Sequence, residues 1–157
     1  MLVLYTDGAC TNNGKSKAKS SWGVYCQSLT PSSYMGRVPS GLQSNNRGEL
    51  YAILQAIQLF RQQSKELECI IKTDSNYCQQ AIHVWIHKWK QNNWKTSNQT
   101  NVKNKDLLQE IDRLMQPTIH IVHVSNYNHI VPNEQSDLDH WGNYHADQLA
   151  KKALEEE

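Results

Sequence analysis

The sequence predicts one α/β domain built on a mixed five-stranded sheet that is flanked by helices. Two observations carry this prediction. The first third of the chain alternates short apolar runs with turn-forming residues, as three antiparallel strands do. The remainder alternates helical periodicity with short β-rich runs, which favours parallel strands added to that first unit and helices packed on the sheet.

Three strands are expected at the start of the chain. Residues 1–6 are an apolar run that ends at Asp7, and the polar stretch 11–15 turns the chain back into a second strand over 22–26. A weaker third strand is expected over 33–38, between two prolines. These strands form the antiparallel part of the predicted sheet.

Helices and strands alternate in the rest of the chain, because apolar residues recur there at helical spacing between short β-rich runs. The expected elements are, in order, a helix from Glu49, a strand over 67–73, a helix capped by Ser75, a helix over 107–115, a strand over 118–124 and a helix over 146–154.

Length and composition fit a single domain over residues 1–157, since a chain of this size with 38% hydrophobic residues can bury a real core. Four widely spaced cysteines without a Cys-x-x-Cys pair favour reduced thiols over a zinc site or a disulfide framework. The net charge of +1 does not by itself indicate a polyanionic ligand. Without a signal peptide or a long apolar run, a soluble, cytoplasmic protein with no membrane partner is expected.

Four acidic residues lie at positions where folding alone does not favour a charged side chain. Asp7 and Asp74 follow apolar strands, and Glu49 and Asp147 share helical faces with apolar residues. Each has an ordinary alternative. The two aspartates could form turns or helix caps, Glu49 could be a first-turn acid favoured by the helix dipole, and Asp147 could be an exposed helical acid.

Together the four acids predict a metal site, because several carboxylates buried in one place require a cation. Oxygen ligands favour Mg²⁺, with Mn²⁺ as a substitute, over zinc. Two such ions about 3.5–4 Å apart can activate a water and stabilise the leaving oxygen during in-line attack on a phosphodiester. We therefore expect a phosphoryl-transfer site.

The stretches around these acids resemble, in order, the four motifs of type 1 ribonuclease H. They are Tyr5-Thr6-Asp7-Gly8-Ala9-Cys10, Asn45-Asn46-Arg47-Gly48-Glu49-Leu50, Thr73-Asp74-Ser75-Asn76-Tyr77 and Gly142-Asn143-Tyr144-His145-Ala146-Asp147-Gln148-Leu149-Ala150. The resemblance covers essentially the whole chain and implies the ribonuclease H-like fold.

The resemblance also implies an activity. The chain would hydrolyse the RNA strand of RNA–DNA hybrids as an endonuclease, leave 5′-phosphate and 3′-hydroxyl ends, and work as a monomer. Asp7, Glu49, Asp74 and Asp147 would be the catalytic, metal-binding carboxylates, with Asp7 and Asp74 nearest to both ions.

A stretch rich in tryptophan and lysine, residues 83–95, is the candidate for gripping the substrate. Basic side chains can pair with phosphates while rings pack on sugars or bases. Alternatively, the tryptophans are half-buried packing residues at roughly helical spacing. The stretch resembles the basic protrusion with which some bacterial family members grip the DNA strand. The residues concerned are Trp85, Lys88, Trp89, Trp94 and Lys95.

Selection of RNA requires contacts to 2′-hydroxyl groups, which both donate and accept hydrogen bonds. By the resemblance, the residues expected on the RNA strand are Asn13, Asn46 and Asn76, and those near the DNA phosphate pocket are Ser44, Asn45 and Arg47. Without the resemblance, loop asparagines are interpreted as turn formers.

The catalytic loop histidine of the family is where this sequence departs from the pattern, because the segment from Tyr127 to Trp141 contains an insertion. Counting from the preceding strand places the position at Tyr127, whereas counting back from Asp147 gives His140. We expect His129 to fill the role, because a histidine titrates near neutral pH and a loop can carry it to the site. An ordinary surface histidine is the alternative.

Three other functions are open to such a sequence. A different nuclease or strand transferase on the same fold is disfavoured by the tryptophan–lysine stretch and the asparagines. A hybrid-binding module without catalysis is disfavoured by the four acids, because a protein that only binds phosphates gains affinity by losing negative charge. The third is a domain cut from a reverse transcriptase.

Overall fold

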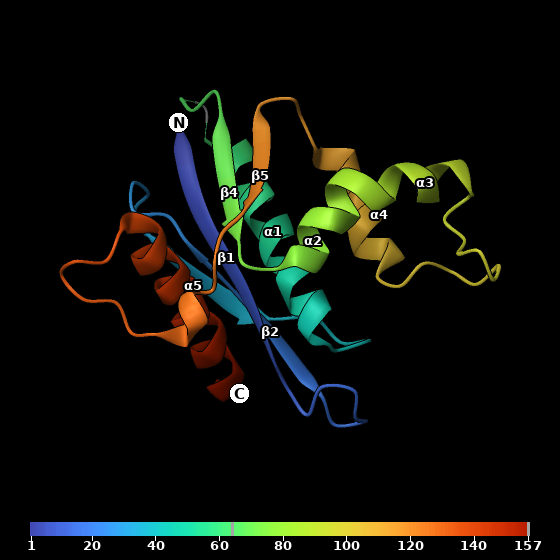
Figure 1. The fold of residues 1–157 in the computed structure, drawn as a ribbon, viewed down its shortest axis with the longest axis horizontal. Helices are drawn as coiled ribbons and strands as arrows, with labels where there is room; N and C mark the ends of the chain where they lie inside the picture. The colour runs from blue at the N-terminus through green and yellow to red at the C-terminus, as the bar shows by residue number, and fades with distance from the viewer. Residues whose placement is uncertain (64, 157) are drawn as a thin grey trace.

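The computed structural model describes residues 1–63 and 65–156, so Glu157, the last residue of the expected domain, lies outside the described part. The strands are β1 (Leu2–Thr11), β2 (Lys19–Tyr25), β3 (Ser33–Arg37), β4 (Cys69–Thr73) and β5 (Ile119–His123). They form one sheet in the order β3-β2-β1-β4-β5 (Figure 1). Strands β1 to β3 pair antiparallel, and β4 and β5 extend the sheet in parallel. The predicted mixed sheet is therefore confirmed.

Within the described residues, five α-helices and two short irregular helical turns surround this sheet. They are α1 (Asn45–Arg61), α2 (Asn76–Gln80), the π-helical turn η1 (Ala81–Trp85), α3 (Ile86–Gln91), α4 (Lys105–Leu114), the 3-10 turn η2 (Tyr127–His129) and α5 (Leu138–Glu155). Across residues 1–63 and 65–156, none of the helices is both long and apolar enough to cross a membrane.

Helices α1 and α5 cover opposite faces of the sheet. A Cβ atom on Gly8 of β1 would meet the α1 backbone, whereas a Cβ on Gly23 of β2 would lie 2.5 Å from the carbonyl oxygen of Ala146 in α5. The main hydrophobic core fills the α1 side. It includes Leu2 and Leu4 of β1, Ile71 of β4, Leu50, Ile53 and Ile57 of α1, and Leu108 and Ile111 of α4.

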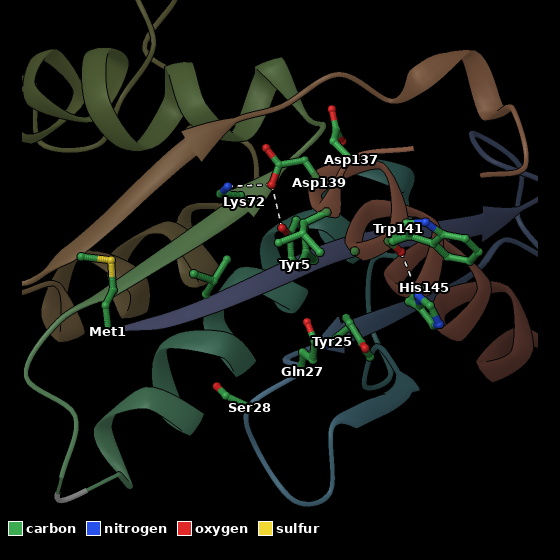
Figure 2. A pocket seen from close by; sticks show the side chains of 13 residues that line it. Met1, Tyr5, Tyr25, Gln27, Ser28, Lys72, Asp137, Asp139, Trp141 and His145 are labelled. Atoms are coloured by element: carbon green, nitrogen blue, oxygen red, sulfur yellow. Dashed lines mark hydrogen bonds and ion pairs between the residues drawn. The ribbon is translucent and has the colours of Figure 1, made fainter. Parts of the chain in front are cut away.

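The α5 side of the sheet is covered only in part. Near the start of β1 it opens into a pocket of about 1070 Å³, whose floor includes Tyr5 and Lys72 and whose rim includes Trp141 and His145 of α5 (Figure 2). Helix α5 meets the sheet through small buried residues such as Ala146 and so lies close to β1 and β2.

Strand β1 extends beyond Asp7, where the sequence predicted its end. Its parallel pairing with β4 ends at Thr6 and Thr73, but its antiparallel pairing with β2 continues to Thr11. The predicted end was therefore wrong for the strand as a whole, because β2 supplies hydrogen-bond partners that β4 does not. Asp7 is still the first residue beyond the parallel pair.

Two helices begin earlier than their apolar periodicity indicated. Ser44 caps α1 by accepting a hydrogen bond from the Arg47 amide, and Asp137 caps α5 by accepting one from the His140 amide. Their first turns are polar or exposed and therefore carry no apolar pattern. As a result Glu49 lies in the second turn of α1, and Asp147 lies in the middle of α5. The predicted cap of α2, Ser75, is confirmed.

Candidate active site

Three carboxylates from three separate segments meet at one edge of the sheet. Asp7 lies in β1, Glu49 in α1 and Asp74 directly after β4. Each supplies an oxygen atom, and these atoms all lie within 4.8 Å of one another. Asp7 is 4% exposed, and Glu49 and Asp74 are half-buried, so the cluster lies partly within the protein.

Two glycines allow α1 to come close enough to β1 to build this cluster. A Cβ atom on Gly8 would collide with the backbone of Gly48 and Glu49, and a Cβ on Gly48 would lie 2.6 Å from the carbonyl oxygen of Ser21. A larger side chain at either position would push the helix off the strand. The close approach places Glu49 beside Asp7.

Burial and mutual repulsion raise the pKa values of these acids. The pKa of Asp7 lies well above its usual range because the group is buried and because Glu49 and Asp74 are close. Burial likewise raises the pKa of Glu49 well above its usual range, with a further contribution from Asp74. Without a cation, this cluster therefore tends to retain protons at a pH at which isolated carboxyls have lost them.

One oxygen of the cluster has no partner. Within the described residues the Oε2 atom of Glu49 is buried and makes no hydrogen bond. Leaving a buried acceptor unsatisfied is unfavourable, and a cation would satisfy it. Together with the all-oxygen donor set of Asp7, Glu49 and Asp74, this orphaned atom fits a hard divalent cation such as Mg²⁺ or Mn²⁺.

The surroundings of Asp74 include groups that lower its pKa as well as groups that raise it. Burial raises its pKa, and the Asp147 charge adds to this. The pKa is lowered by Asn143, whose Nδ2 atom donates to Asp74 Oδ2 at 3.2 Å, and by the nearby His129. Asp147 forms an ion pair with Lys151 at 3.0 Å. Asp147 therefore lies beside the three-acid cluster, and its charge is paired with the Lys151 side chain.

The candidate histidine lies next to these acids. His129 is the last residue of η2 and lines a cavity of about 100 Å³ together with Asn143, Asp147 and Lys151. His140, the other histidine considered from the sequence, belongs to α5 and is bonded through Nε2 to the carbonyl oxygen of Ile130 at 2.6 Å.

The sequence of the chain matches the RNase H family model over residues 1–155. The chain belongs to the ribonuclease H family. This confirms the resemblance of the four acidic motifs and accounts for the mixed sheet, on which carboxylates from β1, α1 and the end of β4 meet.

Ribonuclease H relatives occur in bacteria and in animals. Ribonuclease H of Thermosynechococcus vestitus is 37% identical over 138 residues, which are 87% of this chain and 84% of that protein. Ribonuclease H of Francisella philomiragia is 37% identical over 160 residues, covering 99% and 91%. Mouse Ribonuclease H1 is 34% identical over 137 residues, and the chain spans about half of its length, 47%.

Solved ribonuclease H structures share the fold. The RNase H domain of prototype foamy virus superposes with a TM-score of 0.70 at 21% identity, covering 97% of this chain and 93% of the domain. LC11-RNase H1, solved in complex with an RNA/DNA hybrid, gives a TM-score of 0.60 at 18% identity and covers 99% and 97%. At these identities the similarity shows the fold alone.

The tryptophan–lysine stretch forms an arm over residues 81–95, made of η1, α3 and the turn that follows (Figure 1). Its rings make a ladder, with centroids 5.9 Å apart for Tyr77 and Trp85, 5.9 Å for Trp85 and Trp89, and 6.4 Å for Trp89 and Trp94. Trp85 is 40% exposed, whereas Trp89 and Trp94 pack against the core. The exposed ring is available to a ligand, and the inner two support it.

The lysines of this arm differ from each other. Lys88 is exposed on α3. Lys95 is half-buried and donates from Nζ to Asn101 Oδ1 at 2.7 Å, across the turn after α3. Lys88 is therefore the more readily accessible of the two predicted basic contacts.

The residues expected on the substrate strands gather at the start of α1 and α2. Asn46 and Asn76 are exposed there, while Asn13 accepts a hydrogen bond from the Asn45 amide at 3.1 Å, and Ser44 caps α1. Asn13, Ser44, Asn45 and Asn46 therefore lie at the start of α1, and Asn76 begins α2.

Arg47 is paired with an acidic side chain of the protein. Its guanidinium forms two parallel hydrogen bonds of 2.9 Å with the Asp106 carboxylate, and its side chain is only 12% exposed. This pair raises the pKa of Arg47 and lowers that of Asp106. A phosphate at this position would have to share Arg47 with Asp106 or displace that carboxylate.

Sequence reasoning missed two buried asparagines of the site. Asn143 lies four residues before Asp147, on the same face of α5, so helical spacing could have found it. Asn104 donates to the Tyr77 hydroxyl at 3.1 Å and accepts from Arg47 at 3.4 Å, with a left-handed backbone at φ 62°. No local sequence pattern identifies Asn104 as a buried hydrogen-bonding residue, because its partners are remote in sequence.

Proposed function

We propose that this chain is a divalent-metal-dependent endoribonuclease that hydrolyses the RNA strand of RNA–DNA hybrids by a two-metal-ion mechanism, leaving 5′-phosphate and 3′-hydroxyl ends. The observation that carries the proposal is the cluster of Asp7, Glu49 and Asp74, in which the buried Oε2 atom of Glu49 has no hydrogen-bond partner among the described residues. Its relatives named ribonuclease H, and a family structure with bound RNA/DNA hybrid, support the substrate.

The metal would be held by Asp7, Glu49 and Asp74, with Asp147 as a further ligand. Mg²⁺ suits these oxygen donors and Mn²⁺ would substitute for it. Bound ions would supply an activated water and stabilise the leaving oxygen. The chain contributes burial, which excludes bulk water, and carboxylates that must release their protons before they can bind a cation.

His129 would act beside the metal ligands. It lines the same cavity as Asp147 and Lys151, and an imidazole can take or give a proton near neutral pH. In this proposal it carries a proton for the leaving group or assists departure of the product.

Substrate recognition would come from two surfaces of one chain, which supports action as a monomer. Asn13, Asn46 and Asn76 would contact the 2′-hydroxyl groups of the RNA strand. The arm over residues 81–95 would hold the DNA strand, with Trp85 as a stacking surface and Lys88 as a phosphate contact.

The proposal is tested with RNA–DNA hybrid, double-stranded RNA and double-stranded DNA, each labelled on one strand at a time. Cleavage is measured with Mg²⁺, with Mn²⁺ and with a chelator, and the product ends are identified by their response to a phosphatase and a ligase. Cleavage confined to the RNA of the hybrid, absent with chelator, is the expected result. Tight hybrid binding without cleavage under either metal would instead identify a binding module.

A further inference from the structure

The turn that carries His129 has an unusual backbone. Tyr127, Asn128 and His129 have φ values of 53°, 52° and 58°, so three consecutive residues with side chains adopt the left-handed conformation. Such a run is unfavourable for residues other than glycine and persists only when surrounding contacts hold it. The contacts that hold this turn therefore decide where the His129 side chain lies.

Both ends of the turn are fastened to the first turn of α5. At its start, the Tyr127 ring stacks on His140 with centroids 4.4 Å apart and planes 6° apart, and the Tyr127 hydroxyl donates to Asp137 at 3.2 Å. At its end, the carbonyl oxygen of Ile130 accepts from His140 Nε2 at 2.6 Å. The His140 imidazole thus contacts both Tyr127 and Ile130, the residues that flank Asn128 and His129.

The hydrogen bond to Ile130 requires a hydrogen on the Nε2 atom of His140. A carbonyl oxygen only accepts, so the Nε2 atom of His140 must carry the hydrogen in this arrangement. A phenylalanine at this position would keep a ring for the stack on Tyr127 but would lose the donor. A glutamine would keep a donor but lose the ring.

The first turn of α5 is itself anchored by hydrogen bonds. The Asp137 side chain accepts from the His140 amide at 2.8 Å and so caps the helix. Asp139 accepts hydrogen bonds of 2.6 Å from both the Tyr5 hydroxyl and Lys72 Nζ, which joins the helix to β1 and β4 (Figure 2). The ring of His140 is therefore held by the sheet through its own helix.

We infer that His140, with Tyr127, is a positioning residue that holds His129 in the cavity beside Asn143 and Asp147. The inference rests on the proposed function, in which His129 assists cleavage. The ring contacts of His140 are with Tyr127 and Ile130, so it acts through the backbone of the turn. Both fastening residues lie in the segment from Tyr127 to Trp141, where the sequence departs from the family pattern, so this segment carries its own means of placing the histidine.

The first measurement needs neither metal nor substrate. Amide hydrogen exchange is followed at His129 and Ile130, whose N–H groups donate to Asn126 and Tyr127 within the turn. His140→Phe should raise exchange at both amides about tenfold, the effect of one lost hydrogen bond. His145→Phe, the same replacement on the same helix facing the other pocket, should leave them unchanged. Unchanged exchange in His140→Phe overturns the inference.

The second measurement is single-turnover cleavage of hybrid. His140→Phe should lower the maximal rate by the same factor as His129→Ala, with KM unchanged, and should have no further effect in the His129→Ala background. His140→Gln, which retains a donor, should keep more activity than His140→Phe. Effects of His140→Phe and His129→Ala that multiply would contradict positioning through His129.

The two measurements separate the inference from the proposed function. A wild-type protein that cleaves no hybrid refutes the function, while amide exchange still decides whether His140 holds the turn. A protein that cleaves hybrid normally but shows no change in exchange on His140→Phe refutes the positioning role alone.

Discussion

The carboxylate cluster and the arm over residues 81–95 are built in opposite ways. The cluster lies where β1, α1 and β4 meet. Asp7 is buried, Glu49 and Asp74 are half-buried, and the pKa values of all three are raised. The arm begins with a short π-helical turn, and its most exposed ring, Trp85, is 40% exposed. Buried charge is unfavourable unless a ligand compensates it, whereas an exposed aromatic ring can remain without a ligand at little cost.

This difference predicts a division of labour. Groups that act on the reacting phosphate must be held rigidly, which regular elements do better than loops. Groups that add affinity along a polymer need only a surface of the right character. Changes in the cluster should therefore reduce the rate of the bound complex, and changes in the arm should reduce binding.

The largest effect is expected for Asp7→Asn. Loss of a carboxylate from the proposed metal site should lower the maximal cleavage rate by about 1000-fold or more, because metal assistance supplies several kcal/mol to such reactions. Hybrid affinity should stay within about twofold of wild type, since the arm is intact. Single-turnover kinetics and a binding assay measure the two quantities.

Asp74→Asn and Glu68→Gln form a matched pair for the same test, because they remove one charge at opposite ends of β4. Glu68 precedes the strand and is paired with the exposed His120. Asp74→Asn should behave as Asp7→Asn does, and Glu68→Gln as wild type. Comparable losses in both variants would assign the effect to net charge.

The next effect is expected for Trp85→Ala. One base-stacking contact corresponds to about 1–3 kcal/mol, so Kd for the hybrid should rise roughly 5- to 150-fold with little change in the rate at saturation. Val84→Ala, which shortens the exposed neighbour, is the control. A Trp85→Ala protein that binds normally but cuts slowly would break the proposed division of labour.

A smaller effect, of about tenfold on kcat/KM, is expected for Asn143→Ala, which removes a hydrogen bond to a charged group. Asn143 lowers the pKa of Asp74 by donating to its charged form, so its loss should raise that pKa. The acidic limb of the pH–rate profile should therefore move to higher pH. A reduced rate with an unmoved acidic limb would show that Asn143 acts on packing alone.

The smallest effect is expected on stability without metal. The pKa values of Asp7 and Glu49 are raised in the folded state, so the folded protein holds protons that the unfolded chain releases above about pH 4. These acids therefore lower stability progressively as pH rises from there towards their folded pKa values. Asp106 and Asp139 have lowered pKa values and act in the opposite direction, so the total need not follow the cluster.

The difference in stability between Asp7→Asn and wild type isolates the contribution of the cluster. Asp7→Asn should be more stable than wild type in metal-free urea unfolding, by on the order of 1 kcal/mol near neutral pH, and the difference should vanish at about pH 4. An advantage that stays constant with pH would show that Asp7 does not hold a proton in the folded protein.

The regular parts of this molecule could be predicted from its sequence, because their signals are local. Glu49 shares a helical face with Ile53, which indicated a buried acid. Asp74 follows an apolar run of strand length, which indicated the end of a strand. The order of strands and helices led to the mixed sheet for the same reason.

The parts that escaped prediction depend on remote or unfavourable contacts. The start of α5 escaped because Leu138 is exposed and Trp141 faces a pocket, so neither contributes to an apolar stripe. The pairing of Arg47 with Asp106 joins residues far apart in sequence. The left-handed backbone at Tyr127 is held by Ser125, whose Oγ accepts from the Tyr127 amide at 2.9 Å, and by the stack on His140 of α5. Nothing in its own residue type favours it.

The most direct test of the carboxylate cluster is a calorimetric titration of Mn²⁺ into the metal-free protein, with Asp7→Asn and Glu68→Gln beside the wild type. Saturable binding by wild type and Glu68→Gln, lost in Asp7→Asn, is the predicted result, with proton release on binding because the buried acids must ionise. Equal binding by all three proteins would contradict the assignment of the metal to Asp7, Glu49 and Asp74.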